Sequence, residues 1–357
     1  MRVFELPPQL GPRARGQAHG EAFRPLIAEI AAIRTALTVE LGAFRDEGEV
    51  LAVARRHLAP LRRFDEQLAE ELEGIAQGAG LAPEAIVVLN HYTDLRDLVP
   101  ARLPADEDCS VLWARGRDGR ALAGQTWDMH GSAAPYVMML GVPEGPDGPA
   151  AWCLSLTGCL GMTGLNAAGV AVCINNLKSL DARIGVVWPA LVRRALRERS
   201  AVAARDVVLH APLGSGHHYL CADDADAFGI ETSGTRKAVV FDARAVPHAH
   251  AYVHTNHCLP GSPVGDVSAI GVESTTLERY AWLSQSVRLH PPRDREALWE
   301  RLGSHDGYPR SVCTHLSSPA QPHGVTTCGA VAMDLRERRM LAAAGCVHRA
   351  RGIDFGF

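Results

Sequence analysis

The feature that most constrains the fold is a change of sequence pattern at Cys109. From His19 to about Leu81, apolar residues recur at spacings of three and four, which is typical of amphipathic helices. After Cys109 the chain consists mainly of short β-rich runs separated by turn residues, with few helical stretches between them. Many strands with few crossover helices predict an α+β fold of layered, mainly antiparallel sheets.

Local signals place the expected elements. Gly78 and Gly80 are typical helix stops, and Pro83 is expected near the start of a further short helix. Segment 99–108 reads as an exposed connection. The expected strands are SVLWAR, RALAGQTW, YVMMLGV, AWCLSLT, GVAVCINN, HHYLCAD, FGIET, KAVVFD, AYVHTN, GAVAMDL and RMLAAAG. The later expected helices are WPALVRRALRERSAVAARDVVLH, TTLERYAWLSQSVRLH and DREALWERLGSH.

Composition excludes several classes of protein. The 357 residues allow a sizeable core, and the net charge of −4 does not indicate binding to nucleic acid or to a membrane surface. The N-terminal run MRVFELPPQLGPRARG has no apolar region of a signal peptide, and no stretch approaches the length of a membrane span. Nine scattered cysteines without a C-x-x-C pair are typical of a reducing compartment. We therefore expect a cytoplasmic protein.

A hairpin is predicted around Asp118-Gly119, because that dipeptide favours a two-residue type I′ turn. Such a turn sets Cys109 opposite Asp128, with Cβ atoms about 4.5–5.5 Å apart. Free cysteines are usually packing residues, so a buried thiol is the alternative. The first position of a strand that follows an acidic segment is a poor place for a packing thiol, and a thiol beside a carboxylate can be a nucleophile.

Cleavage of the bond between Asp108 and Cys109 would give the cysteine both a nucleophile and a base. Its new α-amine, with a pKa of about 7.7–8, can take the proton of its own thiol near neutral pH. The same thiol could break the bond by attacking the Asp108 carbonyl, and Asp128 would then hold the new ammonium group.

The run CSVLWARGRDGRALAGQTWD resembles the nucleophile hairpin of the acyl-coenzyme A:6-aminopenicillanic acid acyltransferase family, whose members are self-processing N-terminal-nucleophile hydrolases. The segments GPRARGQAHGEAFRPLI, EELEGIAQGAGLAPEAIVVLN, GLNAAGVAVCINNL and VHTNHCL are similar to other parts of that family, in the same order. The resemblance implies a four-layer αββα sandwich. It also implies a helical α chain (1–108) and a β-rich catalytic β chain (109–357) that together form one domain. One departure is Asp108, where the penicillin-pathway enzyme has glycine; a bulkier, charged side chain there is expected to slow or prevent self-cleavage.

The resemblance also assigns site residues. Asn256 is implied for the oxyanion hole, with a turn or strand-end cap as the alternative. The resemblance implies supporting roles for Ser233 and Ser311. Further candidate supporting or substrate-binding positions, from the chemistry of the residues, are Arg310, Gly164 and Trp127. Read alone, the two serines are ordinary loop hydroxyls and Arg310 a solvated arginine.

Histidines cluster before and after Asn256, at His248, His250, His254 and His257. On a strand the first three would share one face. No acidic or cysteine partner stands at metal-ligand spacing, so the signal for a metal is weak. No metal and no cofactor are expected.

The sequence therefore predicts a cysteine amide hydrolase in which Cys109 forms an acyl-enzyme. The alternative is an acyltransferase that moves an acyl group from coenzyme A or an amide to an amine. Two further hypotheses are a metal-dependent hydrolase that uses the histidine cluster and an uncleaved, non-catalytic relative. The expected partner is a small amide or thioester; the sequence leaves a homo-oligomer open.

Overall fold

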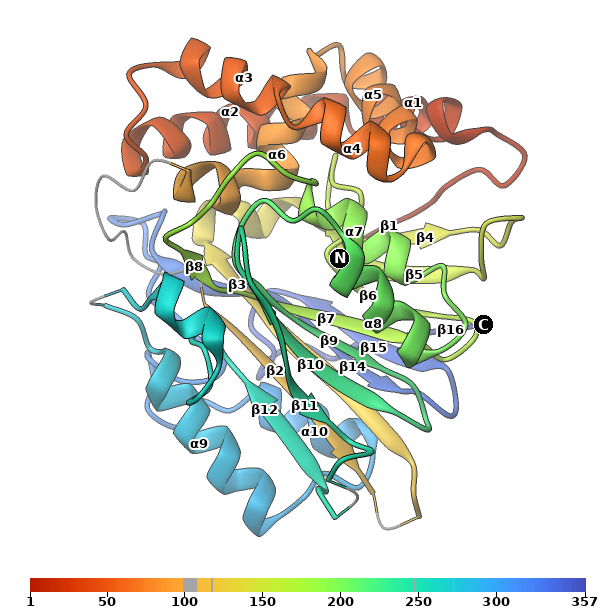
Figure 1. Cartoon of the computed structure of the whole chain (residues 1–357), viewed down its shortest axis with the longest axis vertical. Coiled ribbons are helices and arrows are strands. Elements are labelled where there is room, and N and C mark those ends of the chain that lie inside the picture. The colour runs from red at the N-terminus through yellow and green to blue at the C-terminus, as the bar shows by residue number, and fades with distance from the viewer. Residues whose placement is uncertain (99–107, 117, 247, 272) are drawn as a thin grey trace.

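Two large stacked β-sheets form the centre of the molecule (Figure 1). The structure is a computed structural model and describes residues 1–98, 108–116, 118–246, 248–271 and 273–357. One sheet has eight strands in the order β1-β4-β5-β6-β7-β9-β10-β11, and the other has six in the order β12-β2-β3-β14-β15-β16. A short pair, β8 and β13, lies apart from both. Every described pairing between these strands is antiparallel except that of β1 with β4.

The strands and helices have the following bounds. The strands are β1 (Arg2–Glu5), β2 (Cys109–Arg115), β3 (Ala121–His130), β4 (Val137–Val142), β5 (Ala151–Leu156), β6 (Thr163–Asn166), β7 (Ala171–Asn176), β8 (Lys178–Ser179), β9 (His217–Ala222), β10 (Ala227–Thr232), β11 (Lys237–Asp242), β12 (Ala251–His254), β13 (Ser268–Ala269), β14 (Val325–Asp334), β15 (Arg339–Ala344) and β16 (Ile353–Gly356). The α-helices are α1 (Pro12–Ala22), α2 (Arg24–Leu41), α3 (Glu47–Arg55), α4 (Leu58–Phe64), α5 (Glu66–Ala79), α6 (Pro83–Asp97), α7 (Trp188–Ala195), α8 (Ala201–His210), α9 (Thr276–Leu289) and α10 (Arg295–Leu302).

Helices cover both outer faces of the stacked sheets. Helix α8, which follows α7, packs on β9 and β10 of the eight-stranded sheet, while α9 and α10 pack on the six-stranded sheet. The first six helices gather at one end of the sandwich, at the top of Figure 1. The predicted αββα arrangement is confirmed. One apolar core lies between the sheets and extends under the N-terminal helices, and a smaller one lies between the six-stranded sheet and the α9–α10 layer.

Glycines set the spacing of the first helical pair. A Cβ atom on Gly16 of α1 would lie 2.0 Å from the Glu71 carbonyl oxygen, and one on Gly74 of α5 would lie 2.0 Å from the Arg13 carbonyl oxygen. The backbones of α1 and α5 therefore approach more closely than any side chain would allow. This packing is the physical reason for Gly16 and Gly20 in GPRARGQAHG and for Gly74 and Gly78 in EGIAQGAG.

Several expectations from the sequence are confirmed and others are corrected. Helix α5 ends with Gly80 in a left-handed conformation, at φ 73°, and α6 begins at Pro83. The predicted helical stretch 188–210 is two helices, because Ser200 caps a new start by accepting the Ala203 N–H. Strands β1, β6, β8, β13 and β16 were not predicted. Segment 99–107, expected as a connection, lies outside the described residues; Asp108, expected to be exposed, is buried.

No single helix within the described ranges is both long and apolar enough to cross a membrane. The pair α5 and α6, bent by 116°, passes that length and composition test only when the two helices are taken together.

Candidate active site at the start of strand β2

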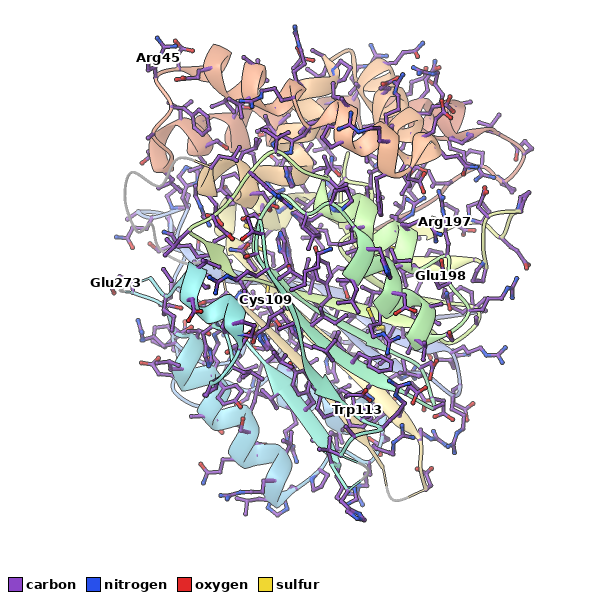
Figure 2. All side chains as sticks on the ribbon, viewed as in Figure 1. Arg45, Cys109, Trp113, Arg197, Glu198 and Glu273 are labelled. Atoms are coloured by element: carbon purple, nitrogen blue, oxygen red, sulfur yellow. The ribbon has the colours of Figure 1, made fainter. Side chains whose placement is uncertain are left out.

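Cys109 is the first residue of β2, a strand flanked on both sides within the six-stranded sheet. It lies opposite Trp127 of β3. On the other side, β12 pairs His254 with Val111, and continuing this antiparallel ladder by two residues sets Asn256 opposite Cys109. Figure 2 shows Cys109 inside the molecule, with Trp113 farther along the same strand. The strand end thus has a neighbour on each side.

The predicted register of the hairpin is wrong by one residue. Gly116 N–H donates to the Arg120 carbonyl at 2.9 Å, so the loop has three residues, and Gly119 at its end has φ 79°. A three-residue loop with a left-handed final residue is a common alternative to the two-residue turn. The extra loop residue moves the partner of Cys109 from Asp128 to Trp127.

This shift puts Cys109 and Asp128 on opposite faces of the sheet. Cys109 is 4% exposed and lies with Val111 in the core between the sheets. Its burial contradicts the expectation that this strand position is unsuited to a packed thiol. Ser110 and Thr126 form the next cross-strand pair, and Asp128 shares their face, toward α9. Asp128 is therefore near the backbone of β2 rather than beside the thiol.

Arg279 of α9 holds the backbone at this strand end. Its guanidinium is buried, and its Nη1 donates to the Cys109 carbonyl at 2.7 Å and to Ser110 Oγ at 2.9 Å. Its Nε donates to Thr275 Oγ1 at 2.8 Å. These contacts place a fixed positive charge against the residue that the sequence predicts as nucleophile.

The second terminal nitrogen of Arg279 reaches across the predicted cleavage point. Nη2 donates to Asp108 Oδ1 at 2.7 Å and to Asn256 Oδ1 at 3.1 Å. The other Asp108 oxygen accepts from Thr275 Oγ1 at 2.7 Å. All five N–H donors of the guanidinium therefore have acceptors. This pairing explains how the chain buries the Asp108 carboxylate, whose residue is 2% exposed.

Asn256 makes the remaining contact to the nucleophile's backbone. Its Oδ1 accepts the Cys109 N–H at 2.6 Å, and its Nδ2 donates to the Asn176 carbonyl at 3.0 Å. Its own N–H donates to Thr276 Oγ1 at 2.7 Å, at the start of α9. The same helix thus positions both Arg279 and Asn256.

Asp128 has an environment that favours its protonated form in the uncleaved chain. Burial is the main cause that raises the pKa of its carboxyl to about 7; the charge of Arg279 opposes this rise, and the negative charge of Asp108 adds to it. Thr126 Oγ1 donates to Asp128 Oδ2 at 3.1 Å. The group is therefore poised to change its ionisation when its charged neighbours change.

Two buried amide groups offer donors beside the layer that contains Cys109. Gln125 lies opposite Val111, and its Oε1 accepts the Ile174 N–H at 2.7 Å. Its Nε2 and the Nδ2 of Asn175 have no hydrogen-bond partner in the described part of the chain. Unused buried donors are costly, so they are candidates for contact with a bound carbonyl oxygen.

The other predicted positions make different contacts. Ser233 Oγ donates to Asp181 at 2.9 Å, and Ser311 Oγ donates to the Cys313 carbonyl at 2.8 Å. Arg310 forms an exposed ion pair with Glu278. Gly164 lies within β6, where a Cβ would be 2.3 Å from the Trp152 carbonyl oxygen. None of these contacts reaches Cys109, and the roles of these residues stay predictions.

The histidine cluster does not form one strand face. Only His254 lies in β12, and its ring nitrogens contact Asn175 Oδ1 and Glu231 Oε1, both at 3.0 Å. His257 Nδ1 contacts Thr276 Oγ1 at 2.9 Å. The expected shared face of His248, His250 and His254 is therefore wrong.

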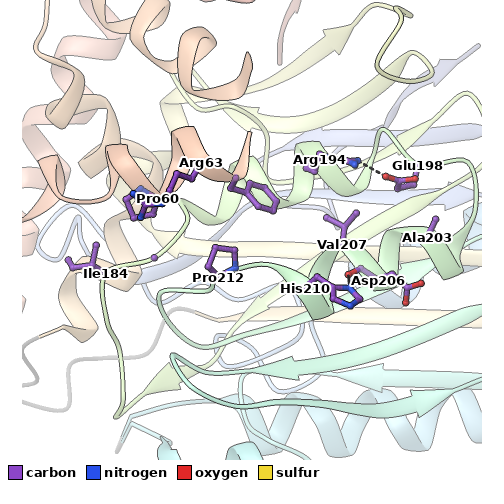
Figure 3. Close-up of a pocket in the computed structure, with 12 residues that line it drawn as sticks. Pro60, Arg63, Ile184, Arg194, Glu198, Ala203, Asp206, Val207, His210 and Pro212 are labelled. Carbon is purple, nitrogen blue, oxygen red and sulfur yellow. Dashed lines mark hydrogen bonds and ion pairs between the residues drawn. The ribbon is translucent and has the colours of Figure 1, made fainter. Parts of the chain in front are cut away.

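Two pockets on the surface of the molecule do not include Cys109 in their lining. One of about 680 Å³ is formed by α4, α7, α8 and the segment around Ile184, on the outer side of the eight-stranded sheet (Figure 3). Another of about 390 Å³ on the α9 side is lined by Arg279, Arg310 and Ser311 among others. The second pocket leads toward the Arg279 network, and it brings together two of the predicted substrate-binding residues.

Arg279 and Thr275 were missed by the sequence analysis, although a signal exists. The buried positions of α9 are Thr276, Arg279, Leu283 and Val287. An arginine in register with an apolar stripe needs a buried partner, and that pattern marks it as a site candidate.

Comparisons with known proteins identify the family. The sequence model of the acyl-coenzyme A:6-aminopenicillanic acid acyl-transferase family matches residues 114–321, more than half of the chain, beginning after Cys109. The chain belongs to this family, and it is accordingly an enzyme of the class that acts on amide bonds or transfers acyl groups. The 40 kDa form of acyl-coenzyme A:6-aminopenicillanic-acid-acyltransferase from Emericella nidulans is 27% identical over 307 residues, which are 85% of this chain and 82% of that protein.

Solved structures with a similar arrangement include two hydrolases. Penicillin V acylase from Agrobacterium tumefaciens has a TM-score of 0.43 and 14% identity, over 66% of this chain and 83% of its own. A mutant of conjugated bile acid hydrolase from Clostridium perfringens has a TM-score of 0.44 and 11% identity, over 70% of this chain and 97% of its own.

Proposed function

We propose that the chain cleaves itself between Asp108 and Cys109, and that the freed Cys109 is the nucleophile of an amide hydrolase. The observation that carries the proposal is the position of Arg279, which binds the Asp108 carboxylate on one side of this peptide bond and the Cys109 carbonyl on the other. A buried guanidinium in that place holds both halves of the scissile bond in a fixed conformation.

The cleavage step balances without a cofactor. The Cys109 sulfur attacks the Asp108 carbonyl carbon, the C–N bond breaks, and the nitrogen gains the thiol proton to become an amine. Water then hydrolyses the resulting thioester, which releases the Asp108 α-carboxylate and restores the thiol. The product is a 1–108 chain and a 109–357 chain, which stay associated because β1 and the first six helices pack on the second chain.

Cleavage changes the charges around Asp128. When Asp108 leaves, Arg279 loses its ion-pair partner and Asp128 loses a negative neighbour that raises its pKa. Both changes favour ionised Asp128, which can then pair with the new ammonium group and with Arg279. The α-amine of Cys109 serves as the base for its thiol, and Asn256, with Gln125 or Asn175, can supply amide donors to the oxyanion.

The proposed substrate is a small acylated amine or peptide-like amide that acylates Cys109, after which water releases the acid. Acyl transfer to an amine is the second candidate, because the family and the Emericella nidulans relative carry that activity in their names. Incubating the cleaved enzyme with an acyl donor and candidate amines distinguishes the two. Free acid in excess is the expected result, and an excess of the transferred amide would establish the second candidate.

Intact-mass analysis of the freshly purified full chain beside Cys109→Ala tests the proposal. We expect two fragments that meet at Asp108/Cys109 in the wild type and a single uncleaved chain in the variant. Cys173→Ala, which removes another buried thiol, is the control and should still be cleaved. An active wild type that begins only at Met1 would refute self-cleavage.

A further inference from the structure

Two cysteines and two histidines converge at one edge of the six-stranded sheet, apart from Cys109. They are His305, Cys313, His315 and Cys346, and their ligand atoms all lie within 4.8 Å of one another. They come from three segments: the turn after α10, the loop before β14, and the turn after β15. We call this group the His₂Cys₂ cluster.

The four atoms form a closed ring of close contacts. His305 Nε2 lies 3.2 Å from His315 Nε2, and the two sulfurs lie 3.9 Å apart. His315 Nε2 is 3.4 Å from Cys313 Sγ, and His305 Nε2 is 3.5 Å from Cys346 Sγ. Each ligand atom therefore faces two others at once.

These separations are those of four ligands around one zinc ion. With Zn–N of about 2.0–2.1 Å and Zn–S of about 2.3 Å, a tetrahedron has N···N about 3.3 Å, N···S about 3.5 Å and S···S about 3.8 Å. The four measured distances differ from these values by about 0.1 Å. The agreement covers all three kinds of ligand pair.

Hydrogen bonds alone do not account for the ring. A neutral imidazole Nε2 has either one N–H or one lone pair, and it points in a single direction in the ring plane. It cannot make two good hydrogen bonds, one to the other histidine and one to a sulfur. A central cation satisfies all four atoms together.

We propose that the His₂Cys₂ cluster binds one Zn²⁺ ion in a structural site. Thiolate and imidazole ligands in a tetrahedral S₂N₂ set are typical of zinc. Two thiolates neutralise the charge of the ion, which suits a cluster with one buried and three half-buried members. Four protein ligands leave no open position for water or substrate, so the ion stabilises structure rather than catalysing a reaction.

Contacts around the cluster hold the ligands in place. Cys313 N–H donates to the Ser304 carbonyl at 3.0 Å, and His315 N–H donates to the Pro309 carbonyl at 2.9 Å. The His348 ring stacks on His305 at 4.3 Å between centroids. Preorganised ligands of this kind are typical of metal sites.

The position of the cluster explains what the ion would do. Residues 303–324 contain no helix or strand, and loops of this length are uncommon unless something holds them. The site ties this loop at three points to the turn after β15. Since neither the family match nor the Cys109 chemistry requires an ion there, this proposal stands apart from the proposed function.

Metal analysis of the full chain tests the proposal. We expect about one zinc ion per chain after purification and dialysis. In Cys313→Ser and His315→Ala the zinc content should fall about tenfold. Cys258→Ser, at a half-buried cysteine outside the cluster, is the matched control and should keep its zinc. Loss of zinc to a chelator should lower Tm in the wild type and in Cys258→Ser.

A second measurement covers the case in which the ligand variants fail to fold. Wild-type chain stripped of metal and loaded with Co²⁺ should show the visible bands of tetrahedral cobalt and a thiolate-to-cobalt charge-transfer band. Octahedral Co²⁺ spectra, wild-type chain without zinc even after incubation with ZnCl₂, or a Cys313–Cys346 disulfide in the native protein would each overturn the site.

Discussion

The two cysteine-containing regions beside the six-stranded sheet are held together in different ways. At Cys109 a single arginine has an acceptor for every donor, and it joins a strand end, a helix and a loop by ordinary hydrogen bonds. In the His₂Cys₂ cluster four thiol and imidazole groups converge within 4.8 Å of one another, and the proposed zinc ion would satisfy all four. The hydrogen bonds of the first region are complete in the uncleaved chain and would be broken by the proposed cleavage, whereas the second region would be completed by the proposed ion.

The regions are close enough to influence one another. Thr314, between two cluster residues, donates its N–H to Thr327 Oγ1 at 2.8 Å, and Thr327 is the β14 partner of Asp128. Variants in one region, tested for their effect on the other, show whether each region functions independently.

Arg279→Ala should have the largest effect on stability. In a Cys109→Ala background, which keeps the chain uncleaved, it leaves the buried Asp108 carboxylate without its partner and should cost about 3–5 kcal/mol. Urea unfolding measures this. Arg310→Ala, which removes an exposed ion pair, is the control and should cost at most about 1 kcal/mol. Equal effects of the two variants would mean that Arg279 does not organise the site.

Asn256→Ala should slow self-cleavage by about 10²–10³-fold, because an amide that contacts the reacting backbone is lost. The first-order time course by intact mass is the measurement. Asn256→Asp keeps an oxygen to accept the Cys109 N–H but removes the amide donor, so its rate separates the two functions. Zinc content should be unchanged in both variants; a fall in zinc would show that the regions are coupled.

The stability of the uncleaved chain should depend on pH through Asp128. Burial raises the pKa of this carboxyl to about 7, so its proton stabilises the fold fully below the unfolded pKa and is lost as the pH rises through 7. Asp128→Asn in the Cys109→Ala background should remove this slope, at most about 1.4 kcal/mol per pH unit. Urea unfolding at about pH 4 to 8 measures it. The exposed Asp147→Asn should leave the slope intact.

Thr327→Val should have the smallest effect on self-cleavage and on zinc content. It leaves the Thr314 N–H without its acceptor and should cost about 1–3 kcal/mol. If the two regions are independent, self-cleavage and zinc content will both be close to wild type once the loss of stability is corrected for. A large fall in the cleavage rate or in the zinc content would show that Thr327 couples the two regions.

Local signals in the sequence determined much of this protein. Gly80 and Pro83 marked a helix end and a helix start, short β-rich runs between turn residues marked most strands, and Cys109 was placed at the head of a strand. These features depend on backbone conformation and apolar spacing within a few residues, so they can be read without the fold. The layered α+β class follows from their order.

Tertiary structure alone decided the contacts that carry chemistry. One extra loop residue before Ala121 moved Asp128 to the other face, and only the packing of α9 brings Arg279 across the Asp108–Cys109 bond. The His₂Cys₂ cluster joins residues as far apart as His305 and Cys346, with only the Cys313-x-His315 spacing visible locally. Such sites depend on how distant segments pack, which no local pattern in a single sequence specifies.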